Sequence, residues 1–197
     1  KLIGTWSYSK ANRIFVDYAD LPPYLVQALI ATEDERFEEH SGIDFRALVR
    51  VAVKTLLLRQ KSAGGGSTIT QQLVKQLYSG TAGSVRERAL QKPIEWVISL
   101  KIERHYTKEE IITMYLNHFD FLHNAVGIKT AAKTYFGKEP KDLTLNEAAT
   151  LVGMCKNPSY FNPVRKPERC QERRNVVLGQ MKRAGYLSQE EYDKLIL

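Results

Sequence analysis

Cysteine is scarce in this sequence, and Cys155 and Cys170 are the only two among 197 residues. Without a second pair, the chain cannot build a four-cysteine metal site, and it lacks the cysteine density of a disulfide scaffold. The two residues allow either one disulfide, in an oxidising compartment, or two free, packed thiols. A chain of this length can instead rely on one substantial hydrophobic core.

Long apolar runs are also absent. No stretch is long enough to cross a bilayer, and no signal peptide is recognisable. The chain begins at Lys1 rather than at a methionine. We therefore expect it to be part of a longer protein.

Acidic residues are outnumbered by basic ones, with 22 Asp and Glu against 29 Lys and Arg, a net charge of +7. This balance indicates an anionic partner: nucleic acid, a phosphate-bearing substrate or an anionic membrane surface. The sequence contains no helix-turn-helix or aromatic-basic nucleic-acid motif, so we do not expect nucleic acid to be the partner.

Strand-rich blocks and internal repeats are missing, whereas helical periodicity recurs along the chain. The sequence predicts a mainly α-helical fold in a single domain spanning residues 1–197. Predicted helices cover residues 24–39, 45–59, 85–104 (interrupted or bent by Pro93), 108–116, 126–135, 145–154 and 168–184, and a further helix opens near Ser67. Predicted caps are Asp44 and the capping boxes Thr107 with Glu110 and Thr144 with Glu147.

The segment 31–42 combines five carboxylates with His40 and Phe37. At helical spacing Leu25, Ala28, Leu29 and Thr32 share one stripe. Glu33 therefore falls where a packed helix runs out toward a cleft, and Phe37 can anchor that end. A partly desolvated carboxylate beside a second acid, Asp34, suits a general base. The alternative is an ordinary solvated helix end.

The segment Phe45–Arg59 mixes many apolar residues with exclusively positive charges. This pattern suits a helix at a membrane interface, whose basic side chains reach the headgroups, or a core helix with a basic outer face. A glycine-rich loop over residues 61–66 follows and leads into a helix start, where free backbone N–H groups can bind an anion. It is not a Walker loop, because no Gly-Lys-Ser/Thr ending is present.

A positive patch with one carboxylate is predicted further along the chain. Arg88, Lys92 and Glu95 lie along one helical face, and Lys75 can join them. Such a patch suits a pyrophosphate leaving group, whose growing charge is stabilised by cations already in place. Taken singly, these residues are equally well explained as surface ion pairs.

Five motifs in order resemble those of the peptidoglycan glycosyltransferases, the polymerases of class A penicillin-binding proteins and of monofunctional transglycosylases. They are Glu33-Asp34-x-x-Phe37-x-x-His40-x-Gly42, Gly65-Gly66-Ser67-Thr68-Ile69-Thr70-Gln71-Gln72-x-x-Lys75, Gln91-Lys92-Pro93-Ile94-Glu95, Lys108-Glu109-Glu110-Ile111-Ile112-x-x-Tyr115-Leu116-Asn117 and Arg173-Arg174-Asn175-Val176-Val177-Leu178. Together they cover most of the chain.

The resemblance implies a lysozyme-like, mainly helical domain that polymerises lipid II with inversion at the anomeric carbon and release of undecaprenyl pyrophosphate. It assigns Glu33 as the general base and Glu95 as the second essential carboxylate, near the donor pyrophosphate. It places three groups of residues at the substrate. Asp34 supports Glu33. The donor site is hydrogen-bonded by Ser67, Thr68 and Gln71, and the phosphates are held by Lys75, Arg88 and Lys92.

The third motif departs from the family pattern, because Gln91 stands where an arginine is usual and Pro93 replaces a helix-friendly residue. The spacing also leaves Arg86 as an alternative to Arg88. These departures concern the phosphate ligands and leave both carboxylates in place.

The resemblance also implies a setting and partners. The catalytic domain would lie on the outer face of the bacterial cytoplasmic membrane, touch the bilayer through residues 45–66 and follow a membrane anchor that precedes Lys1. Its partners would be lipid II and the growing glycan strand, and a transpeptidase domain could follow Leu197. No cofactor or metal-binding motif is indicated, although a divalent cation such as magnesium could accompany a pyrophosphate.

Two other functions compete. Lysozyme-like folds also carry the paired carboxylates of glycoside hydrolases and lytic transglycosylases, but that chemistry leaves the cations at Lys75, Arg88 and Lys92 without a purpose. A basic helical binding module with no activity is the third hypothesis.

Overall fold

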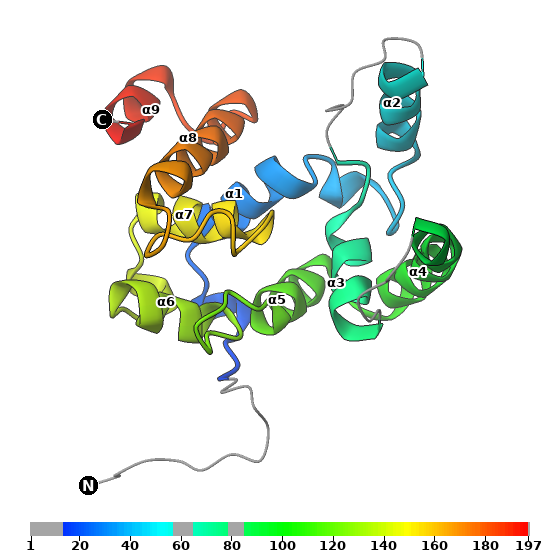
Figure 1. Ribbon diagram of the computed structural model, residues 1–197, viewed down its shortest axis with the longest axis horizontal. Helices are drawn as coiled ribbons and strands as arrows, with labels where there is room; N and C mark the ends of the chain where they lie inside the picture. The colour runs from blue at the N-terminus through cyan, green and yellow to red at the C-terminus, as the bar shows by residue number, and fades with distance from the viewer. Residues whose placement is uncertain (1–13, 57–64, 79–84, 197) are drawn as a thin grey trace, which may run out of the picture. The chain divides into compact units, whose positions relative to one another are not determined.

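The computed structural model describes residues 14–56, 65–78 and 85–196, without the side chains of 54–56 and 85–89. The prediction of a mainly α-helical fold is confirmed (Figure 1), because the strand pairing within these residues is a single bridge between Asp120 and Val126. The helices are α1 (Pro23–Glu33), α2 (Phe45–Leu56), α3 (Ile69–Tyr78), α4 (Val85–His105), α5 (Lys108–His118), α6 (Ile128–Phe136), α7 (Leu145–Cys155), α8 (Pro167–Arg183) and α9 (Gln189–Ile196), with 3-10 turns at Tyr18–Asp20, Phe37–Glu39 and Pro140–Asp142.

Three of the helix predictions differ from the structure. Helix α1 ends at Glu33, so the prediction that it continues to residue 39 was wrong, and residues 37–39 form a 3-10 turn. Helix α4 runs through Pro93 without interruption. The last helix, α9, was not predicted at all, although Ser188 and Glu191 form a capping box at its start.

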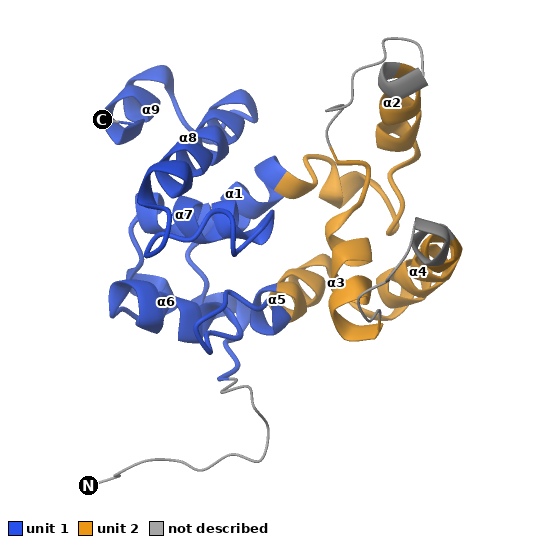
Figure 2. Ribbon diagram, in the orientation of Figure 1, with its two compact units in different colours: residues 1–32, 116–197 blue, residues 33–115 orange. Residues whose placement is uncertain are grey.

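The chain divides into two compact units, one of residues 1–32 and 116–197 and the other of residues 33–115 (Figure 2). In the first unit α7 packs against α8, and α8 packs against α9. Both cysteines are buried here as thiols that are not joined in a disulfide, and burial raises the pKa of Cys170 to about 11. Cys170 is therefore a poor nucleophile at neutral pH.

The second unit is built around α3, which packs on α4. The core of this unit includes Phe37, Ile69, Leu73 and Ile111, all fully buried. Phe37, which was predicted to anchor the end of the first helix, lies after α1 and is part of this core. Lys108 lies over its ring, 4.3 Å from the centroid.

Helix α2 presents an apolar stripe to solvent. Asp44 caps the helix, as predicted, by accepting a hydrogen bond from the Ala47 N–H at 3.0 Å. Phe45, Val49 and Val53, four residues apart along one face, are 67%, 62% and 43% exposed. This face is therefore not buried in the described core, which argues against the core-helix interpretation. None of the described helices is long and apolar enough to span a bilayer.

Candidate active site

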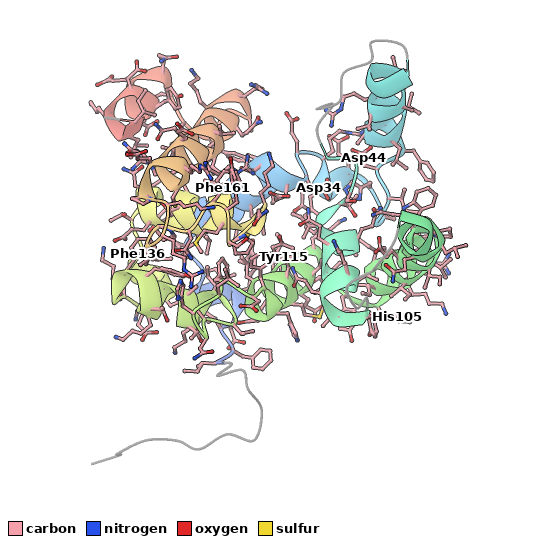
Figure 3. The ribbon with its side chains drawn as sticks, in the orientation of Figure 1. Asp34, Asp44, His105, Tyr115, Phe136 and Phe161 are labelled. Atoms are coloured by element: carbon pink, nitrogen blue, oxygen red, sulfur yellow. The ribbon has the colours of Figure 1, made fainter. Side chains whose placement is uncertain are left out.

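The first turn of α3 connects the residues predicted for the site. Thr68 caps this helix, because its Oγ1 accepts a hydrogen bond from the Gln71 N–H at 3.2 Å. The Ile69 N–H donates to Asp34 Oδ2 at 3.0 Å, which places a carboxylate at the positive end of the helix. Figure 3 shows Asp34 beside the start of α3. The residue directly after Glu33 is thus fixed to this turn.

Asp34 also binds His40, whose Nε2 lies 2.9 and 3.0 Å from the two carboxylate oxygens. The Gly42 N–H donates to His40 Nδ1 at 3.2 Å, so the proton of a neutral ring resides on Nε2 and points at Asp34. With Asp34 only 8% exposed, these contacts fasten the segment after α1 to α3.

Glu33 is the last residue of α1 and is half-buried. Gln72 Nε2 donates a hydrogen bond to Glu33 Oε2 at 2.9 Å, and Gln72 Oε1 accepts one from the Tyr115 hydroxyl at 3.1 Å. Tyr115, on α5, is fully buried and appears beside α3 in Figure 3. Neither Gln72 nor Tyr115 was predicted from the sequence to act in the site, although both lie within the motifs quoted above.

Thr68 and Gln71 are directed at the protein backbone. Thr68 Oγ1 and Gln71 Nε2 both donate to the Gly42 carbonyl oxygen, at 2.8 and 3.0 Å, and each residue is 1% exposed. Gly42 itself has φ +92°. These side chains therefore brace the turn at Gly42 against α3.

Lys92 connects α4 to the same region. Its Nζ donates to Ser67 Oγ at 3.0 Å and lies 2.9 Å from Glu95 Oε2, as the shared helical face predicted. The Glu95 side chain is 7% exposed and that of Lys92 is 45% exposed. Glu95 Oε2 is covered by protein and takes no aligned hydrogen bond within the described part of the chain, so its contact with Lys92 is an ion pair. A lysine side chain that is nearly half exposed and held in this way can still reach an anion from solvent.

The remaining predicted phosphate ligands are only partly described. Lys75 is exposed on α3. The side chains of Arg86 and Arg88, at the start of α4, lie outside the described residues. Among the described residues there is no cluster of three or more His, Cys, Asp or Glu side chains that could hold a metal ion.

Residues 1–182 match the family model described as Transglycosylase. The chain belongs to this family. It is 40% identical over 197 residues to penicillin-binding protein 1A of Aquifex aeolicus, covering 100% of this chain and 26% of that one. It is 41% identical over 188 residues to penicillin-binding protein 1A of Escherichia coli, covering 95% and 21%.

A solved structure agrees with these matches. The crystal structure of penicillin-binding protein 1A from Haemophilus influenzae aligns with 95% of this chain and 18% of its own, with a TM-score of 0.56 and 28% identity. The motif-based resemblance is therefore confirmed, and the chain is a peptidoglycan glycosyltransferase domain. It spans about a quarter of the length of the curated relatives described above.

Proposed function

We propose that this chain, as a lysozyme-like helical domain, polymerises lipid II into glycan strands with β-1,4 links and releases undecaprenyl pyrophosphate. The observation that carries the proposal is the set of contacts made by the segment from Ser67 to Gln72, which runs into the first turn of α3. Glu33 is bound by Gln72, and Glu95 is paired with Lys92, which also binds Ser67 just before the helix. The segment from Ser67 to Gln72 thereby contacts both a candidate base and a candidate phosphate-binding cation.

Glu33 is the general base of this mechanism. Its carboxylate takes the proton from the 4-hydroxyl of the acceptor N-acetylglucosamine as that oxygen attacks the anomeric carbon of the donor. The new O4–C1 bond forms on the face opposite the departing phosphate, so the anomeric centre inverts. The C1–O bond to phosphate breaks, and its electron pair leaves with the pyrophosphate.

Lys92 stabilises the charge that grows on the departing pyrophosphate. Glu95 holds the Lys92 ammonium in place at 2.9 Å, and Ser67 does so at 3.0 Å. Lys75 and Arg88 add positive charge around the same phosphates. Asp34, Thr68 and Gln71 contribute by fixing the segment after α1 to α3 through their hydrogen bonds to Ile69 and Gly42.

Residues 45–66 contact the outer surface of the bacterial cytoplasmic membrane, where the lipid substrate resides. The exposed stripe of Phe45, Val49 and Val53, with Arg46 and Arg50 exposed on the same helix, supports this contact. Apolar side chains enter the acyl boundary while arginines reach the lipid phosphates. A transpeptidase domain that followed Leu197 would cross-link the strands that this domain makes.

Replacing Phe45 and Val49 together with serine should weaken binding to vesicles of phosphatidylethanolamine and phosphatidylglycerol at least about tenfold, because two apolar side chains no longer leave water. Co-sedimentation measures this. The matched control is Val164→Ser, which removes a similarly exposed valine (70%) from the first unit. Equal binding by the double variant and the control would contradict the membrane contact.

The proposed function is tested by incubating the chain with lipid II and, separately, with finished peptidoglycan. We expect glycan strands to grow from lipid II and finished peptidoglycan to stay intact. Clearing of finished peptidoglycan without strand growth would instead establish a hydrolase or lytic transglycosylase. Binding of lipid II without either reaction would establish a binding module.

A further inference from the structure

We infer that Gln72 and Tyr115 form a relay that sets the direction of the Glu33 carboxylate, which makes both of them positioning residues for the reaction. The inference rests on the proposed function, because it takes Glu33 as the base. It adds to the candidate site two residues that the resemblance to the family motifs gives no role. The geometric evidence is a chain of hydrogen bonds, 2.9 Å from Gln72 Nε2 to Glu33 Oε2 and 3.1 Å from Tyr115 to Gln72 Oε1.

The orientation of the Gln72 amide follows from chemistry. An ionised carboxylate only accepts hydrogen bonds, so the amide must turn its NH₂ group toward Glu33. Its carbonyl oxygen then faces Tyr115, whose hydroxyl can donate. A flipped amide would direct its oxygen at the carboxylate and repel it. Tyr115 therefore selects the one amide orientation in which Gln72 can hold the base.

Both ends of the relay are anchored. The Tyr115 ring is fully buried, so its hydroxyl has little freedom to move. Gln72 lies one turn into α3, the helix whose first N–H groups are bound by Asp34 and Thr68. Because Asp34 directly follows Glu33, the helix that carries Gln72 is fixed next to the group it orients. The distance between the Gln72 amide and the Glu33 carboxylate is thus set by the contacts of Asp34 and Thr68 at the start of α3.

The relay is tested with Tyr115→Phe, which keeps the buried ring and removes only the hydroxyl. Without the donor, the Gln72 amide loses its preferred orientation, and a misaligned base slows the chemical step. We expect kcat for lipid II polymerisation to fall about 10- to 100-fold, with KM changed by less than about threefold. Gln72→Leu removes the amide and should lower kcat to a similar extent.

A double-variant cycle separates positioning from general destabilisation. If Tyr115 acts through Gln72, the combined Tyr115→Phe and Gln72→Leu variant should be no slower than Gln72→Leu alone. Tyr135→Phe is the matched control, because it removes a hydroxyl that donates to the Phe121 carbonyl oxygen at 2.6 Å in the first unit. It should keep the wild-type kcat, and thermal unfolding of all four variants reports any loss of fold.

The outcomes distinguish the two proposals. An active wild type with an unchanged kcat in Tyr115→Phe, or with losses that multiply in the double variant, overturns the relay alone. If Tyr115→Phe does not fold, an unchanged kcat in Gln72→Leu overturns the relay equally. A wild type that does not extend lipid II overturns the proposed function and the relay with it.

Discussion

Glu33→Gln should lower kcat for lipid II polymerisation by about 100- to 10,000-fold, the range typical of losing a general base. The amide has the shape of the carboxylate, so the chain should fold normally. It cannot take the proton of the acceptor hydroxyl, and the attacking oxygen therefore remains a weak nucleophile. The variant should still bind lipid II, because no phosphate ligand has changed.

The assay is continuous measurement of glycan formation from labelled lipid II. Glu38→Gln serves as the matched control, since Glu38 belongs to the same acidic segment but is exposed on the 3-10 turn after α1. It makes the same change of charge and should retain the wild-type rate. If Glu33→Gln kept more than about a tenth of the wild-type kcat, Glu33 would not be the base.

Gly42→Ala should lower the free energy of unfolding by about 2–5 kcal/mol. Gly42 has φ +92°, a conformation that alanine adopts only with strain, and an added Cβ would lie 3.0 Å from the backbone carbon and oxygen of Ser99. Helix α4 would have to shift to accommodate it. The Gly42 carbonyl, which binds Thr68 and Gln71, would be displaced as well.

Urea unfolding measures this loss, and Gly137→Ala separates its two causes. Gly137 also has a positive φ, +70°, but nothing lies within 4 Å of its added Cβ. Its substitution should cost only the backbone strain, about 1 kcal/mol. Equal losses in the two variants would show that the contact with Ser99 is not responsible for the effect at Gly42.

Local signals allowed much of the helical fold to be predicted. The capping box of Thr107 with Glu110 and that of Thr144 with Glu147 are both formed as predicted, because each joins residues three apart. The end of α1 was mispredicted for the opposite reason. Its neighbour Asp34 binds the N–H of Ile69, 35 residues away, and helical periodicity contains no information about such a contact.

In the candidate site, too, contacts between residues close in sequence could be predicted and contacts between distant residues could not. The contact between Lys92 and Glu95 could be predicted from their spacing on one helix. The contact of Gln72 with Glu33 and that of Gln72 with Tyr115 span 39 and 43 residues, and they depend on how α3 packs. The same packing turns Thr68 and Gln71 toward Gly42, which residue type alone could not indicate.

The most direct test of the account is a crystal structure of the chain with a donor and an acceptor analogue of lipid II. We predict that the acceptor 4-hydroxyl lies within hydrogen-bond distance of Glu33 and that the donor diphosphate contacts the ammonium of Lys92. A diphosphate bound away from Lys92, or an acceptor hydroxyl out of reach of Glu33, would contradict the proposal that the segment from Ser67 to Gln72 brings the base and the phosphate-binding cation to one substrate.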